Sequence, residues 1–159
     1  MKFFKIIIFL FFISPVSSNE VFKLKKITDL NNPWSLTFIS EKEVLVSDKE
    51  GQIQLINIQS GLKQIVRHNL NYKVDGQGGL LEILKNKEDI YICYTEDRNS
   101  GKTSTSIAKA KYSRKNLNFK NIFQSNPPIN SGYHFGCRMV IQDNKYLFAS
   151  AGERGAGNI

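Results

Sequence analysis

The sequence predicts an all-β fold, a β-propeller of which this chain holds about three blades of an incomplete ring. Three observations lead to this expectation. Short apolar runs are separated by turn sequences such as "NNP", "KEG", "QSG" and "NSG", as in antiparallel strands joined by tight turns. No stretch keeps an apolar period of 3.6 residues, the signature of an amphipathic helix. A hairpin pattern also recurs along the chain, at a spacing typical of propeller blades.

The first residues have the pattern of a secretory signal. Lys2 and Lys5 precede the short apolar run 6–13, and the small residues of "SPVSS" follow at a suitable cleavage position. We therefore expect a signal peptide over 1–18, cut after Ser18, and a mature protein that is periplasmic or secreted. The apolar run is far shorter than the roughly 20 residues of a membrane-spanning helix, so no membrane span is expected after cleavage.

The mature chain, 19–159, is expected to form one domain, the N-terminal portion of a propeller. Its expected strands, in order, are "VFKLKKI" (21–27), "WSLTFI" (34–39), "EVLVSD" (43–48), "QIQLINI" (52–58), "KQIVRH" (63–68), "GLLEIL" (79–84), "DIYICY" (89–94), "STSIAKAKY" (104–112), "CRMVIQ" (137–142) and "YLFASA" (146–151). Runs such as "WSLTFI" and "QIQLINI" alternate apolar with polar residues, as strands with one buried face do. The later runs have the usual length of a strand, and polar turns such as "NSG" and "QDNK" separate them.

Three segments share one hairpin pattern: "SLTFISEKEVLVSD", "GLLEILKNKEDIYICY" and "RMVIQDNKYLFASA". Aligning Val44, Ile90 and Leu147 gives separations of 46 and 57 residues, the size of a blade of about four strands. The alternative is a β-sandwich with chance similarity between hairpins. We favour the propeller because the order of the units and the hairpin length both recur. A ring needs roughly four to eight blades, so we expect this chain to be the front part of a longer protein.

Charge and cysteine content limit the classes of partner. The net charge is +8, and it falls to +6 once the two lysines of the signal are removed, leaving 20 basic and 14 acidic residues. The lysines are scattered, which favours a solvated surface, and an exported protein is not expected to bind nucleic acid. Cys93 and Cys137 can pair in an oxidising compartment, but small thiols in apolar strands are often free, and we favour two free cysteines. Their spacing does not predict a metal site.

Two glycine-rich segments enter strands that are first in their units. Gln77 lies in "VDGQGGLL" four residues before Leu81, and His134 lies in "SGYHFGCRM" five residues before Met139. The first strand of every propeller blade lines the central channel, so loops entering such strands converge on one face. We therefore expect Gln77 and His134 to meet near the axis, although they are 57 positions apart in the sequence.

Four motifs, taken in order along the chain, resemble those of a known family. The motifs "NPWSLTF" (32–38), "GQGGLLEI" (76–83), "GYHFGCRMV" (132–140) and "SAGERG" (150–155) resemble, in order, those of the soluble glucose/sorbosone dehydrogenases. Within that family they are most similar to aldose sugar dehydrogenases that use pyrroloquinoline quinone. The resemblance covers residues 21–159. It implies a six-bladed propeller, exported to the periplasm, that holds the quinone and calcium in a central funnel.

The resemblance also implies an activity and residue roles. The enzyme would oxidise the anomeric hydroxyl of an aldose to a lactone, pass hydride to the quinone and deliver electrons to an external acceptor. His134 matches the general base, and an imidazole, with an unperturbed pKa near 6.5, has a neutral form available near pH 7. Gln77, Glu153 and Arg138 match positions expected to bind substrate or cofactor. The resemblance assigns no metal ligand here, since most quinone and calcium ligands of the family would lie beyond residue 159.

Two other functions stay open. A calcium-dependent propeller lactonase needs several carboxylates and amides around its metal, and the segments entering the inner strands supply few carboxylates. A non-catalytic propeller that binds glycans or a protein partner would show saturable binding and no redox chemistry. Arg138 and Glu153 also have a purely structural interpretation, since "GERG" can be a charged turn.

Overall fold

The structure is a computed structural model that describes residues 22–155 and 157. This part of the chain contains strands and no helix, which confirms the all-β prediction. It therefore also contains no helix long and apolar enough to cross a bilayer. The expected signal peptide, 1–18, lies outside the described residues.

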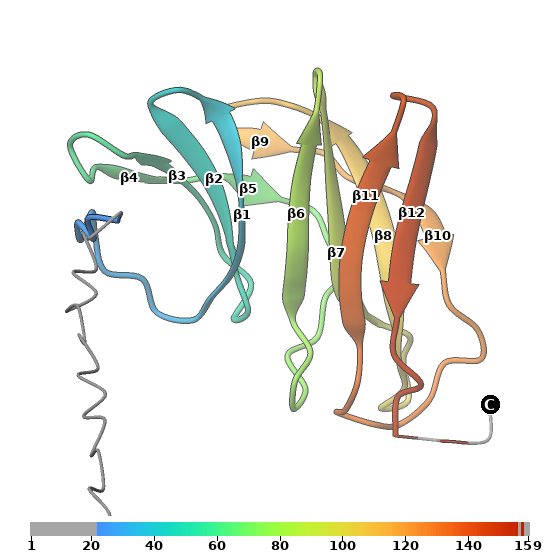
Figure 1. The fold of residues 1–159 in the computed structure, drawn as a ribbon. Coiled ribbons are helices and arrows are strands. Elements are labelled where there is room, and N and C mark those ends of the chain that lie inside the picture. Colours follow the sequence, from blue (N-terminus) through green and yellow to red (C-terminus); the bar gives the residue numbers. More distant parts are fainter. Residues whose placement is uncertain (1–21, 156, 158–159) are drawn as a thin grey trace, which may run out of the picture.

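The strands form three successive antiparallel sheets (Figure 1). The first sheet has the order β1 (Pro33–Ser40), β2 (Glu43–Asp48), β3 (Ile53–Asn57) and β4 (Lys63–Ile65). The second has the order β6 (Leu80–Asn86), β7 (Asp89–Asp97), β8 (Thr103–Lys111) and β10 (Lys120–Gln124). The third is the hairpin of β11 (Gly136–Gln142) and β12 (Tyr146–Ala151). A short parallel pair, β5 (Arg67–His68) and β9 (Asn116–Leu117), joins the connections outside the sheets.

The first strands of the three sheets lie side by side. Figure 1 shows β1, β6 and β11 next to one another, with the later strands of each sheet extending away from them, and β6 contacts both of the others. This is the arrangement of propeller blades around an axis, as the recurring hairpin predicted. The described residues form two four-stranded blades and one hairpin of a third, and they do not close a ring.

Polar contacts fix the first sheet against the second. Ser35 Oγ accepts the amide of Ile83 at 3.3 Å, and Thr37 Oγ1 accepts that of Lys85 at 3.1 Å. From the next strand, the buried Ser47 hydroxyl donates to the carbonyl of Leu81 at 2.5 Å. Because side chains alternate along a strand, the polar side chains of β1 face the second sheet while Leu36 and Phe38 face away.

Apolar clusters fill the spaces on either side of the second sheet. The larger cluster packs residues of the first sheet, such as Leu45 and Ile53, against residues of the second, such as Leu80 and Ile92. A smaller one joins the second sheet to the hairpin and contains Leu81, Cys93, Ile107, Phe135 and Met139. The hydrophobic effect therefore acts mainly between sheets, as expected when blades stack on their neighbours.

The strands of the structure differ from the predicted ones in three ways. The described part of 21–27 forms no strand, since Phe22 and Leu24 are 84% and 97% exposed and have no sheet to pack on. The predicted strand 63–68 is split into β4 and β5, because Val66 turns into the core between them. Strands β9 and β10 were not predicted: β10 is exposed at every residue, so its sequence carries no alternation between buried and exposed positions.

Candidate functional site

Two loops meet where the chain enters β6 and β11. The amide of Gln77 donates to the carbonyl of Gly132 at 2.7 Å, and the side-chain carbonyl of Gln77 accepts the amide of His134 at 2.9 Å. Gly76, with φ of +54°, makes this approach possible, since a Cβ there would lie 2.4 Å from the carbonyl oxygen of Gly132. The structure thus brings Gln77 and His134 together, as the blade spacing predicted.

The imidazole of His134 is oriented by a carboxylate from a third segment. Nδ1 lies 2.5 Å from Oε1 of Glu153, which follows the end of β12. The hydrogen bond with His134 lowers the pKa of Glu153, so this carboxyl is ionised near neutral pH. An ionised carboxylate can only accept, so Nδ1 carries the proton and Nε2 keeps its lone pair in the neutral ring.

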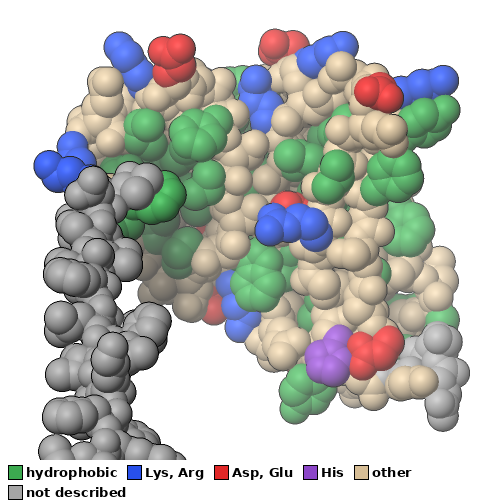
Figure 2. Space-filling view, in the orientation of Figure 1, with side chains coloured by type: hydrophobic (Ala, Val, Ile, Leu, Met, Phe, Trp, Pro, Cys, Tyr) green, Lys and Arg blue, Asp and Glu red, His purple; other side chains and the backbone are tan. Residues whose placement is uncertain are grey.

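The ring of His134 is open to solvent. The side chains of His134 and Glu153 are 53% and 46% exposed, and no hydrogen bond among the described residues occupies Nε2. In Figure 2 a histidine side chain adjoins an acidic one at the lower edge of the visible face. A ligand can therefore reach a nitrogen that is free to accept a proton.

The backbone at this point is in a conformation that residues with side chains rarely adopt. His134 has φ of +48°, in the left-handed region, which costs of order 1–3 kcal/mol and persists where the surroundings impose it. Gly152 is one such constraint: a Cβ there would lie 1.9 Å from the carbonyl oxygen of His134. The turn "AGERG" therefore fits against the histidine loop closely enough to require glycine.

Arg154 binds the loop that carries His134, and it was not among the site residues predicted from the sequence. Its guanidinium donates to the carbonyls of Tyr133 and Thr103 at 3.1 and 3.2 Å, to the hydroxyl of Thr103 at 2.7 Å and to the carbonyl of Ser131. It also lies 3.6 Å from the ring centroid of Phe135, a cation–π contact. Burial lowers the pKa of Arg154, and the negative charge of Asp75 partly offsets this.

These contacts make Arg154 a buried cation whose hydrogen bonds all go to neutral acceptors of the loop region. The sequence does not show that this arginine is buried. What could have drawn attention to it is its place between two glycines, next to the predicted Glu153.

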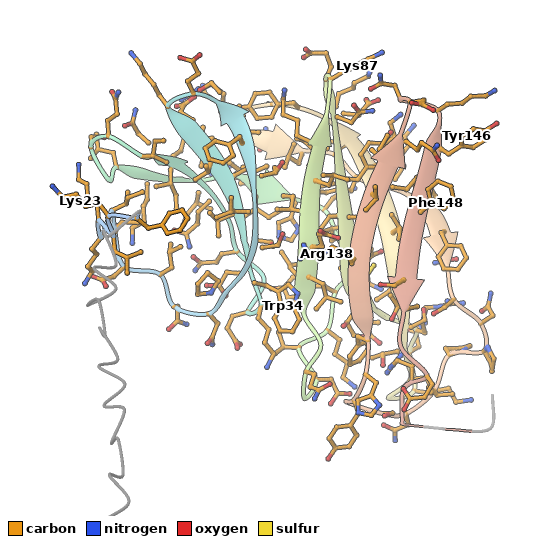
Figure 3. All side chains as sticks on the ribbon, viewed as in Figure 1. Lys23, Trp34, Lys87, Arg138, Tyr146 and Phe148 are labelled. Atoms are coloured by element: carbon orange, nitrogen blue, oxygen red, sulfur yellow. The ribbon has the colours of Figure 1, made fainter. Side chains whose placement is uncertain are left out.

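Arg138 is the one candidate that the structure does not bring into contact with this group. Its guanidinium donates to Glu82 at 2.8 Å, across from β11 to β6, and its side chain is 78% exposed (Figure 3). Glu82, which the sequence did not single out, is buried and also accepts the amide of Met139. The pair borders a hollow of about 380 Å³ that Trp34 and Ser150 also line.

Metal-binding side chains do not gather in the described part of the chain. Within 22–155 and 157, no three His, Cys, Asp or Glu side chains are placed to hold a metal ion. The geometry described above is that of a positioned base and a hydrogen-bonding amide.

Comparison with known proteins gives one family. Aldose sugar dehydrogenase YliI of Escherichia coli (strain K12) is 28% identical over 133 residues, which cover 78% of this chain and 36% of that protein. A solved glucose dehydrogenase is 30% identical with a TM-score of 0.73, and the match covers 79% of this chain and 42% of that one. The apo-form of the soluble aldose sugar dehydrogenase from Escherichia coli is 28% identical with a TM-score of 0.72, over 79% and 39% of the two chains.

The same fold is found at lower identity. The pyrroloquinoline quinone-bound aldose sugar dehydrogenase from Streptomyces coelicolor has a TM-score of 0.72 at 23% identity, over 83% of this chain and 41% of that one. The chain thus spans about two fifths of the length of the relatives it matches. The model of the glucose/sorbosone dehydrogenase family matches residues 30–158, most of the chain, and the protein therefore belongs to that family.

Proposed function

We propose that this protein is a periplasmic quinone-dependent aldose dehydrogenase, which oxidises the anomeric hydroxyl of a sugar to a lactone. One observation carries the proposal most directly. His134 has one ring nitrogen hydrogen-bonded to an ionised Glu153 and the other open to solvent, in the loop that enters β11. A neutral imidazole oriented by a carboxylate is suited to take a proton from a substrate hydroxyl.

In this proposal each residue of the group has one task. Nε2 of His134 takes the proton of the anomeric hydroxyl, and the negative charge of Glu153 stabilises the imidazolium that forms. Gln77 uses its carbonyl oxygen to hold the amide of His134, which leaves its NH₂ group to donate to the sugar or cofactor. Pyrroloquinoline quinone, when bound, supplies the acceptor for the hydride from C1.

Arg138 fits a cofactor that carries carboxylates. Only one of its guanidinium nitrogens is engaged by Glu82 among the described contacts, and the side chain is largely exposed beside the hollow near β1 and β6. The remaining donors suit a carboxylate. Calcium and an external electron acceptor belong to the proposal through the family resemblance alone.

The test is dye reduction by the purified protein supplied with pyrroloquinoline quinone, calcium and an aldose. His134→Ala is expected to lower kcat by about 10²- to 10⁴-fold, the usual contribution of a general base. Quinone binding, followed by absorbance, is expected to persist. The matched control is His68→Ala: its ring bonds the carbonyl of Gly51, no hydrogen bond among the described residues joins it to Gln77, His134 or Glu153, and it is expected to leave kcat unchanged.

Two outcomes would contradict the proposal. Unchanged turnover in His134→Ala would remove the base from the reaction. Hydrolysis of lactones without any added quinone, and no dye reduction with it, would favour a propeller lactonase in place of a dehydrogenase.

A further inference from the structure

The two cysteines of the chain lie at one junction between sheets. Cys93 belongs to β7 of the second sheet, and Cys137 belongs to β11 of the hairpin. Both pack in the apolar cluster that joins these sheets, and both are free thiols in the structure. Forty-three residues separate them in the sequence, from 94 to 136, so the fold alone brings them together.

The thiols are neighbours. Strands β7 and β11 contact one another, and Cys137 packs against the cluster that contains Cys93. The pKa of Cys93 is raised well above its usual value by burial, and further by the adjacent Cys137 thiol and the charge of Glu82. Cys93 therefore stays a protonated thiol, in the same apolar cluster against which Cys137 packs.

The two thiols differ in access. Cys93 is fully buried, whereas Cys137 is half-buried and lines two hollows. One hollow, of about 390 Å³, lies beside Ile107, Phe123 and Leu147. The other, of about 380 Å³, is the one bordered by Glu82 and Arg138. A small reagent can thus reach Cys137 from the surface and can reach Cys93 only through it.

We propose that Cys137 and Cys93 are the attacking and resolving thiols of a disulfide that covalently joins β11 to β7. The oxidant is a small-molecule disulfide, and the reaction is two successive exchanges. The Cys137 thiolate attacks one sulfur of the reagent, forms a mixed disulfide and releases one thiolate. Cys93 then gives up its proton and attacks Cys137 Sγ, which forms the protein disulfide and releases the second reagent thiol. The protein loses two protons and two electrons, and the reagent gains them.

The bond would act on the segment that carries the histidine. Cys137 is three residues after His134, so the disulfide fixes the entry of β11 to the second sheet. Because a cross-link between distant residues restricts the unfolded chain, the oxidised protein is expected to melt about 5–15 °C higher than the reduced one.

The experiment uses protein that has first been fully reduced and then treated with oxidised glutathione. Intact mass is measured after an acid quench, and free thiols are counted in denaturant. Wild type is expected to lose two hydrogens and both thiols and to keep no glutathione. Cys93→Ser is expected to keep one glutathione on Cys137, because no resolving thiol remains. Cys137→Ser is expected to stay unmodified, because Cys93 is out of reach.

Other results overturn the proposal. Wild type that retains glutathione on Cys137, or that keeps two free thiols, shows that the two sulfurs do not meet. Glutathione on Cys93 in Cys137→Ser shows that the order of attack is wrong. None of these readouts depends on sugar oxidation, so the disulfide and the dehydrogenase proposal are tested separately.

Discussion

His134 is held by three different parts of the chain. Gln77 accepts its amide, Glu153 accepts from its ring, and Arg154 binds the carbonyl of the residue before it. Each contact fixes something different: Gln77 fixes the backbone of His134, Glu153 fixes the direction of its ring, and Arg154 fixes the backbone of the preceding residue. In the proposed reaction the base has to lie within hydrogen-bonding distance of the substrate proton, and these three contacts would hold it in place.

Replacing the carboxylate tests the orientation of the ring. In Glu153→Gln the charge that stabilises the imidazolium is removed, so kcat is expected to fall between about tenfold and the roughly 10⁴-fold seen when the acid of a serine-protease triad is made an amide. KM for the sugar is expected to change little. Steady-state dye reduction measures both, and Glu41→Gln, in the exposed turn between β1 and β2, is the matched control. A variant as fast as wild type would show that Glu153 does not act through His134.

Replacing the buried guanidinium tests the support of the loop. Arg154→Met removes every hydrogen bond that this side chain donates to the loop region, and we expect a loss of at least about 2 kcal/mol in the free energy of unfolding. Hydrogen exchange of the amides from 131 to 135 is expected to accelerate, and kcat to fall. Arg154→Lys keeps the charge without the planar fork, so it is expected to rescue only part of kcat. Unchanged exchange in Arg154→Met would contradict a positioning role.

The residues found from the sequence are those that a repeated pattern marks. Gln77 and His134 occupy similar places before two inner strands, and Glu153 stands in a glycine-rich turn that follows a third predicted strand. Glu82 and Arg154 have no such mark, because a buried ion and a solvated one look the same in a single sequence. Their burial depends on sheets that are distant in the sequence, and only the fold shows it.

At the scale of the elements, an ion pair joins the first sheet to the second in addition to the apolar core. Glu43, at the start of β2, receives two hydrogen bonds of 2.7 Å from Arg114, which follows β8. The two residues belong to neighbouring blades, 71 positions apart. The hydrogen bonds from Arg114 lower the pKa of Glu43, although partial burial opposes this.

The sign of this shift predicts a pH dependence. Because the pKa of Glu43 is lower in the folded protein than in the unfolded chain, the pair stabilises the fold above about pH 4.3, the ordinary value for glutamate. That stabilisation is lost as pH falls through the folded value. Glu43→Gln is therefore expected to lower the melting temperature at pH 7 and low salt, and to lower it less at pH 3 or in 1 M salt, where the Debye length is about 3 Å. Differential scanning calorimetry measures this, and an equal difference at both pH values would show that charge is not the cause.

Strand prediction succeeded for the strands with clear apolar runs and failed for the exposed outer strand β10. The alternation of β1 and the dense apolar runs of β6 and β7 are visible in the sequence, since their side chains fill the spaces between sheets. The outer strand β10 is exposed at every residue, and what holds it is its pairing with β8 and the hydrogen bonds of Asn121 and Gln124 to Glu96. The segment from Phe22 to Ile27 shows the opposite case, an alternating pattern without a partner to pair with.

At the scale of the molecule, the first and last sheets each present an apolar outer face. Leu36 and Phe38 are exposed on β1, and Val140 and Phe148 are exposed on the hairpin. Figure 3 shows Phe148 beside β12. Such faces are what a neighbouring blade covers in a propeller. The hairpin repeat was sufficient to predict this architecture, because each blade must bury its faces against units of the same kind.

The central claim is that His134 meets the anomeric hydroxyl of a sugar, and a crystal structure of the protein with pyrroloquinoline quinone and an aldose bound tests it most directly. We predict that Nε2 of His134 lies about 2.6–3.2 Å from the anomeric oxygen, while Nδ1 keeps its hydrogen bond to Glu153. A sugar bound with its anomeric oxygen on another side chain, and the imidazole turned away from it, would contradict the account.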